Sequence, residues 1–387
     1  MRRTAMFGAV LAGILLGANA LGQTSAPQPQ KLFSPVELKP TIGFSTGYDS
    51  NPEEFVDEEG SALQRLDAIL RLTMGDEDAT QAVAAASGSV IGYTNPDISR
   101  DYEYSASLEV SHRIDSQMRI AAGANQSTDG SDDPVTKAGE VWSRVDVDLP
   151  RVQWTFRGTL ADYRELVSRN DIEAFDLETY DYRAGTAVLR TELARGSKLR
   201  PVLEVGLARL DYDRPRPGKR NRDASEYYVI AGAELDMTEE LRLRLGLRRN
   251  QRFFDQPDDR DFASTGPDLA LEWDPNERFG VEFTLGRTLQ EPSREDSVLQ
   301  DVIAAELKAT LKASQRLTLG AGASVEALEH VGDNDRETEW SAFADARWQL
   351  RDRLQLLVEV WTQTERFDRA DEAVDRTMIR AGIEAAF

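Results

Sequence analysis

The chain has 387 residues, a formal net charge of −22 and a mean hydropathy of −0.48, and 29% of its residues are charged. This acidic balance argues against nucleic-acid binding, which requires a basic face. Beyond residue 22, no apolar run approaches the about 20 residues of a membrane-spanning helix, which excludes a helical membrane protein. The chain has no cysteine, which excludes disulfides and a lipid-anchored N-terminal cysteine.

The N-terminal region has the pattern of an export signal. Residues 1–3 are basic, residues 4–21 form an uncharged apolar run, and Ala18-Asn19-Ala20 has the small-x-small form of a signal-peptidase site. We therefore expect residues 1–20 to be a signal peptide that is cleaved after Sec-type export. Cleavage after Gly22 and a retained N-terminal anchor are the alternatives. Residues 21–36 are rich in Pro, Gln and Ser and are expected to form a flexible leader.

From residue 37 onward, apolar and polar residues alternate. Residues 241–248 (LRLRLGLR) and 317–325 (LTLGAGASV) show the pattern most clearly. A period of two places alternate side chains on opposite faces of a strand. A soluble β-sandwich would show the same alternation, but these runs extend over about 10–14 residues. That length exceeds the about five or six residues of a globular strand and fits a tilted membrane strand of about 9–11.

The connections between the runs give a second signal, because short polar turns alternate with longer polar loops. This is the pattern of outer-membrane barrels, whereas a propeller would have four strands in each repeat. The sequence therefore predicts an all-β fold, a closed antiparallel transmembrane β-barrel over residues 37–387, with 16 strands as the alternative to 18 if one hairpin is miscounted. The expected strands lie near residues 37–48, 62–74, 82–94, 102–113, 117–126, 139–149, 151–163, 177–192, 198–210, 224–237, 239–254, 262–273, 277–289, 298–312, 315–329, 337–350, 353–366 and 375–387.

The two faces of these strands differ in chemistry. One face is apolar, and the other carries charges of both signs, which are costly in contact with lipid and stable in an aqueous lumen. The row formed by Arg242, Arg244 and Arg248 is the sharpest candidate for contacting an anionic or sugar solute. The alternative is a solvated wall in which these arginines pair with neighbouring carboxylates. The lumen-facing selectivity candidates are Arg242, Arg244, Arg248, Arg157, Glu282, Glu306, Asp345 and Arg347.

The sequence gives little support for catalysis. His112 and His330 are the only histidines, and no zinc pattern, phosphate loop or nucleotide fingerprint is present. We therefore expect no catalytic residue, metal site or cofactor. The outer loops are mostly acidic, as in residues 49–60, and such oxygens could gather divalent cations that bridge lipopolysaccharide phosphates. A solvated loop without a ligand is the alternative reading.

The C-terminal strand resembles the sorting signal of outer-membrane barrels. Its outer face would carry Phe387, Ile383 and Ile379, and the chain ends in an aromatic residue. We expect Phe387 and Ile383 to act as the signal that the barrel-assembly machinery reads. Phe387 would also make a lipid-facing contact with the first strand, which closes the barrel.

Residues 43–54 (GFSTGYDSNPEE) resemble the opening strand and first loop of the family called putative beta-barrel porin type 2. Pro52 and the acidic residues after Asn51 depart from the family pattern, which often has an apolar residue there. The resemblance implies a Gram-negative outer-membrane barrel associated with exopolysaccharide secretion. It implies a porin-like channel for polysaccharide export or for passive uptake of polar solutes. The expected partners are outer-membrane lipids, lipopolysaccharide and polysaccharide secretion components. A structural or surface-interaction barrel without transport, and an outer-membrane hydrolase, are the alternatives.

Overall fold

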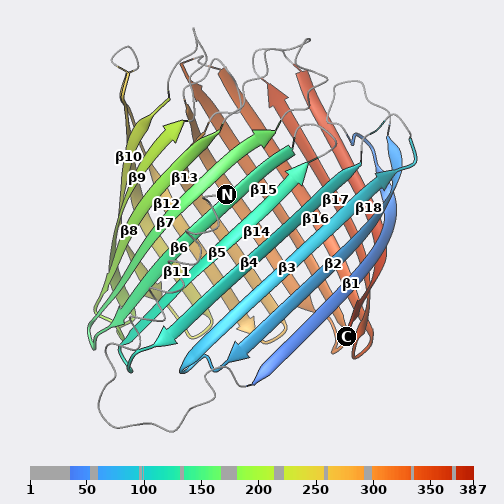
Figure 1. Ribbon diagram of the computed structural model, residues 1–387, viewed down its shortest axis with the longest axis horizontal. Helices are drawn as coiled ribbons and strands as arrows, with labels where there is room; N and C mark the ends of the chain where they lie inside the picture. Colours follow the sequence, from blue (N-terminus) through green and yellow to red (C-terminus); the bar gives the residue numbers. More distant parts are fainter. Residues whose placement is uncertain are drawn as a thin grey trace, which may run out of the picture.

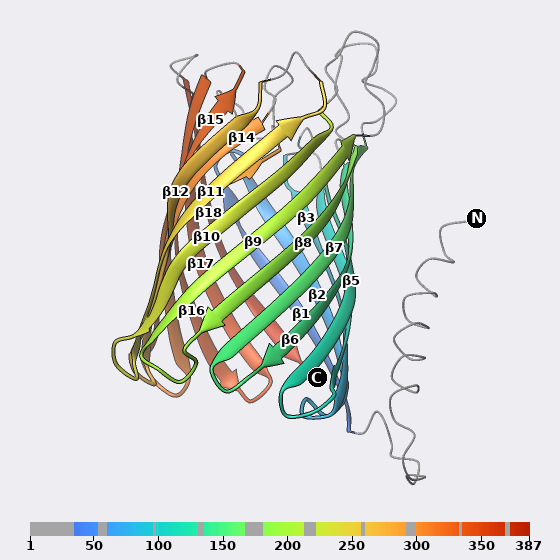
Figure 2. The ribbon, with the colours of Figure 1, turned by 90° about the vertical axis from the view of Figure 1, so that its left-hand side faces the viewer.

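The computed structural model describes residues 35–52, 60–95, 98, 100–130, 135–166, 181–212, 222–256, 260–291, 299–332, 335–367 and 372–387. These residues form a single closed antiparallel barrel of 18 strands (Figures 1 and 2). No helix in this part of the chain is long and apolar enough to cross a membrane. The strands are β1 (Val36–Asp49), β2 (Ser61–Gly75), β3 (Thr80–Tyr93), β4 (Asp101–Arg113), β5 (Met118–Gly130), β6 (Val135–Asp148), β7 (Val152–Leu166), β8 (Tyr182–Leu193), β9 (Leu199–Tyr212), β10 (Ala224–Asp236), β11 (Leu241–Phe254), β12 (Phe262–Asn276), β13 (Phe279–Gln290), β14 (Leu299–Lys312), β15 (Leu317–Val331), β16 (Asp335–Arg351), β17 (Leu354–Phe367) and β18 (Glu372–Ala386).

The barrel closes where its first and last strands pair. Residues 41–49 of β1 run antiparallel to residues 378–386 of β18, and the backbone N–H of Phe387 donates to the carbonyl oxygen of Pro40 at 3.0 Å. Closure leaves no strand edge with unpaired backbone groups, which a hydrocarbon environment requires. The tight turns lie at the same end of the barrel as Phe387, and we call this the turn end and the opposite one the loop end (Figure 2).

The predicted fold class and strand number are confirmed. The largest differences in strand limits are at the loop end of β5 and β6, where the ladder continues to the pair Gly130 and Val135. The sequence expectation ended this hairpin earlier because its outer part is polar, but backbone pairing does not require apolar side chains. Strand β8 begins at Tyr182, and the expected residues before Asp181, like the expected signal peptide and most of the leader, lie outside the described residues.

The two faces of the barrel separate as the alternation predicts. The outer face is apolar and exposed, with Phe44 on β1 directly opposite Ile383 on β18. Trp154, Trp273 and Trp348 lie on this face near the turn end, and each side chain is exposed. Aromatic residues at this level are typical of the girdle that contacts the lipid–water interface. Within this apolar band, the charged residues of the same strands therefore lie on the inner face.

Candidate functional site

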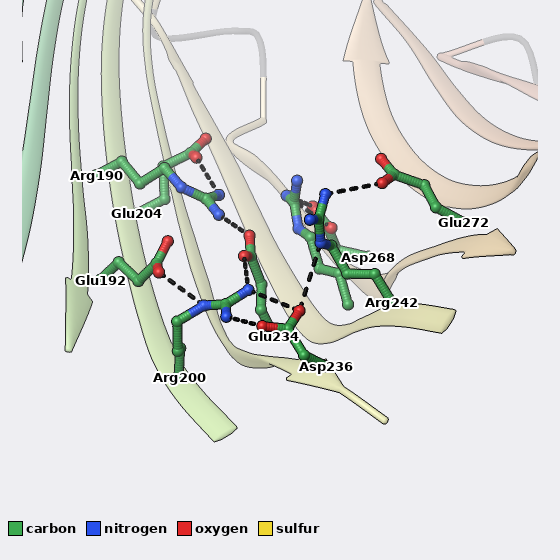
Figure 3. A network of polar contacts seen from close by, with 10 residues as sticks. Arg190, Glu192, Arg200, Glu204, Glu234, Asp236, Arg242, Asp268 and Glu272 are labelled. Atoms are coloured by element: carbon green, nitrogen blue, oxygen red, sulfur yellow. Dashed lines mark hydrogen bonds and ion pairs between the residues drawn. The ribbon is translucent and has the colours of Figure 1, made fainter. Parts of the chain in front are cut away.

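Ion pairs cover the inner face of β8–β12 near the turn end, and we call this region the ion-pair wall (Figure 3). The strand register creates it, because Arg190 lies opposite Glu204, and Arg200 lies opposite Glu234. Arg200 is the hub: its Nε lies 2.8 Å from Glu192 and its Nη2 3.2 Å from Glu234, and it also pairs with Asp236.

The wall continues through the arginine row of β11. Arg242 lies 2.9 Å from Glu272 on β12 and 3.4 Å from Asp236, and Arg244 lies 2.8 Å from Asp268. The charges of Arg242 and Arg244, two of the predicted selectivity candidates, are therefore neutralised by carboxylates. The inner members of the network are largely covered, since the side chains of Arg200 and Glu192 are each 13% exposed. The geometry matches the alternative left open by the sequence, in which the row pairs with neighbouring carboxylates.

Arg248 and Arg157 also lie on the inner face, outside this network. The guanidinium of Arg248 stacks 4.0 Å from the ring centroid of Tyr228, and its Nε donates to Asn250 at 2.7 Å. Arg157 pairs with Glu140 at 3.0 Å and lies 5.6 Å from the ring centroid of Trp142. Cation–π contact of this kind fixes a guanidinium in one position.

The remaining candidates are distributed around the barrel. Glu306 pairs with Lys308 at 2.7 Å, and Asp345 pairs with Arg347 at 3.2 Å. Glu282 occupies the position between Glu272 and Lys308 in the register. The structure thus brings Arg242 and Arg244 together in one network, keeps Asp345 and Arg347 as a pair, and separates the others.

The inner face of β3–β5 has a different chemistry, and we call it the serine wall. Ser87, Ser105 and Ser127 are aligned across three successive strands, and the hydroxyl groups of Ser87 and Ser105 lie 2.7 Å apart. These three side chains are exposed. Sequence reasoning missed this wall. Its signal was serine at alternate positions, as in Ser87/Ser89 and Ser105/Ser107, which a hydropathy pattern does not weight.

A cavity of about 600 Å³ lies against the serine wall and against the inner face of β1, β2 and β16–β18. The strands come from the two ends of the chain, which meet at the β1–β18 seam. The charged side chains that line the cavity are Arg65, Asp67, Glu103, Asp129, Arg347, Glu359, Arg380 and Glu384.

Packed side chains occupy the loop end above the ion-pair wall. Leu210, Ala224, Phe254 and Leu299 form a buried hydrophobic cluster there. A row of tyrosines on β7–β9 lies beside it, with Tyr182 5.1 Å from Tyr163 and 5.4 Å from Tyr212 between ring centroids. The inner face on this side of the barrel is therefore covered by packed residues at the loop end and by ion pairs at the turn end. On the serine wall, the described ion pairs Arg113–Asp78 and Arg119–Glu77 lie at the tight turns, and Ser87, Ser105 and Ser127 are exposed.

Most acidic residues of the loop at 49–60 lie outside the described part of the chain, but Asp49 can be placed, and so can Asp255 of another outer loop. Asp49 is the last residue of β1 and pairs with Arg376 at 2.8 Å, so it belongs to a barrel strand and not to a loop. Asp255 follows β11, and hydrogen bonding from the Arg209 guanidinium lowers the pKa of this carboxyl below its ordinary value. Neither carboxylate is free to join a loop cation site.

The two histidines lie on separate strands, β4 and β15. His112 lies on β4, where its Nδ1 is 2.8 Å from the hydroxyl of Thr80. His330 is fully buried on β15, where its Nε2 is 3.2 Å from Glu337. Asp333, which the sequence places beside His330, lies outside the described residues. Within the described ranges, no group of three or more His, Cys, Asp or Glu side chains is arranged to hold a metal ion.

A closed barrel with an apolar outer face and a polar inner face defines an outer-membrane porin-like protein. The family model described as "Putative beta-barrel porin 2" matches residues 37–387. The match spans the whole barrel, and the chain belongs to this family. That description names the members of the family as porins.

Solved structures show the same fold at very low identity. The siderophore receptor PirA from Acinetobacter baumannii is 8% identical, with a TM-score of 0.51, over 91% of this chain and 80% of that one. The copper transporter OprC is 13% identical, with a TM-score of 0.50, over 90% of this chain and 63% of that one. At these identities the likeness shows the barrel fold alone. No curated protein matches the chain significantly.

Proposed function

We propose that this protein is a passive outer-membrane channel for polar solutes. The observation that carries the proposal is the serine wall, where hydroxyl and carboxylate groups are exposed on the inner face of a closed 18-stranded barrel. Barrels of 16–18 strands are wide enough to enclose an aqueous channel. Groups of this kind replace the hydration of a polar solute and do not bind an apolar one.

Polysaccharide is the polar solute that we propose first. Aromatic rings also lie on the inner face: Trp142 on β6 is next to the serine wall, and Phe343 and Trp361 lie across the closing seam on β16 and β17. A Cβ at Gly123 would overlap the ring of Trp142, so this glycine leaves space for the ring to lie along the wall. Flat aromatic faces beside hydroxyl and carboxylate groups suit sugar rings, which have apolar faces and polar edges. The family resemblance to exopolysaccharide-associated barrels supports the same class of solute.

Planar-bilayer conductance tests the channel directly. The purified full chain, shown to be folded by heat-modifiable migration in a gel, should give stable ion-conducting openings. Folded protein without such openings would support a structural or surface-interaction barrel and would overturn the channel.

The assembly signal is a separate proposal. Ile383 and Phe387 lie on the outer face, and the side chain of Phe387 is 64% exposed. Because the Phe387 side chain is so exposed, it contributes little to packing. Recognition by the barrel-assembly machinery is the role that we propose for an aromatic residue at this position. Phe387→Ala should lower the amount of protein in the outer membrane without changing the unfolding of the protein that does assemble. Unchanged outer-membrane levels would contradict the proposal.

A further inference from the structure

Negative charge exceeds positive charge around the cavity beside the serine wall. Five carboxylates and three guanidinium groups line it. Each of these arginines is held by a carboxylate: Arg65 by Asp67 at 2.8 Å, Arg380 by Glu359 at 2.9 Å and Arg347 by Asp345 at 3.2 Å. The positive charges are therefore neutralised locally, and the excess that a passing solute meets is negative.

Two of the carboxylates face each other directly. Glu103 on β4 and Asp129 on β5 are cross-strand partners, and both are exposed to the lumen. Among the described residues, the cation that pairs with either of them is Arg65, whose Nη2 is 3.6 Å from Glu103. Like charges placed directly opposite each other on one sheet face are destabilising. A cation between the two carboxylates would remove this repulsion.

The rest of the serine wall offers no competing cation. Strands β3, β4 and β5 contain only two basic residues, Arg113 and Arg119, and both lie next to the tight turn. Glu103 and Asp129 lie toward the other end of the same strands. A cation that enters from the loop end would therefore meet hydroxyl groups and carboxylates before it meets any base on this wall.

A buried hydroxyl in the same cavity points independently to a ligand. Ser45 on β1 lines the cavity and is 5% exposed, and its Oγ has no hydrogen-bond partner among the described residues. Buried polar atoms are almost always paired, so an unpaired one in a cavity wall indicates a missing donor or acceptor. An ammonium or hydroxyl group of a solute would supply one.

We propose that the channel is cation-selective, with Glu103 and Asp129 as its main selectivity determinants and with ammonium-bearing polar solutes as the class that binds at the serine wall. The ion-pair wall supports this, because Arg200, Arg242 and Arg244 are each held there in contact with carboxylates. The inference rests on the proposed channel function, but its test is separable. Without openings the channel fails, and with openings only the selectivity is in question.

Reversal potentials in a potassium chloride gradient give the first test. The wild-type channel should favour potassium over chloride. Glu103→Gln with Asp129→Asn should lower this preference by about twofold for each charge removed, since a unit charge about 10 Å away in water changes the local ion concentration by about that factor. Asp162→Asn is the matched control, because Asp162 lies outside the inner face, among Arg164 and Arg183, and its loss should leave the ratio unchanged. Chloride preference in the wild type, or a double variant with wild-type selectivity, would overturn the proposal.

Thiol chemistry gives the second test, because the chain has no native cysteine. Ser105→Cys should react several times faster with a cationic thiosulfonate reagent than with an anionic one of similar size, as expected from local negative potential. Ala106→Cys, on the opposite face of the same strand, should react with neither charged reagent in a membrane. Equal rates for the two reagents at position 105 would contradict the acidic path.

Discussion

The ion-pair wall and the serine wall lie on different parts of one barrel, separated by β6 and β7, and use charge in opposite ways. In the ion-pair wall, arginines and carboxylates are dense, but they neutralise one another and cover one another from solvent. In the serine wall, charges are few, but Glu103 and Asp129 are exposed to the lumen. The density of charge on an inner face therefore does not indicate where a solute is selected. What matters is how much charge is left unpaired.

The comparison predicts that the ion-pair wall contributes far more to stability than the serine wall. Arg200→Ala leaves Glu192, Glu234 and Asp236 without their central cation. Loss of one partner from a largely covered ion network should lower the free energy of unfolding by about 3 kcal/mol. Urea unfolding in detergent or lipid vesicles measures this change. Arg113→Ala, which removes an exposed pair with Asp78, is the control and should have little effect.

A bulky side chain on the serine wall should reduce conductance more than the same side chain on the inner face of β8. Ser105→Trp places a large ring on the open wall and should lower single-channel conductance to roughly half or less, because it narrows the solute path. Thr186→Trp places the same ring on the inner face of β8, beside the packed side, and should change conductance less. Equal reductions would show that solutes do not prefer the serine wall.

The aromatic rings beside the serine wall and across the closing seam should affect sugars more than ions. Trp142→Ala and Trp361→Ala each remove a flat face that is worth about 0.5–1.5 kcal/mol when it packs against a ring. The residence time of a neutral oligosaccharide in the channel, read from interruptions of the current, should fall several-fold. Trp154→Ala, on the outer face, is the control. Residence times that respond only to the control would remove the basis for a polysaccharide solute.

The smallest effect is expected within the serine wall itself. Ser87→Ala removes the 2.7 Å contact with Ser105, but both hydroxyl groups are exposed and can bond water instead. The free energy of unfolding should change by under about 0.5 kcal/mol. A large loss of stability would mean that the serines are structural, as the arginines of the ion-pair wall are.

The alternation of residues was sufficient to predict the barrel, since a period of two fixes both the strands and their faces. It placed Arg242 and Arg244 on the inner face, but it did not give their partners. Those depend on the register between strands, which turn geometry and packing determine in three dimensions. The cavity was beyond sequence reasoning for a related reason. It joins β1–β5 to β16–β18 across the closing seam, and no local pattern indicates which residues meet there.

The serine wall escaped prediction because serine is neither strongly apolar nor charged. The expected strand at residues 82–94 has a run of Ala, Ser and Gly in which alternation is weak. Its hydroxyl groups become meaningful only once β4 and β5 align Ser105 and Ser127 beside Ser87.

The central claim is that solutes pass along the serine wall, and one paired measurement tests it most directly. Ser127→Cys and Thr186→Cys place the same thiol on the serine wall and on the inner face of β8, three strands away. Reaction with one bulky thiol reagent during a planar-bilayer recording should reduce the current strongly at position 127 and weakly at position 186. Equal reductions, or a larger one at position 186, would contradict the claim.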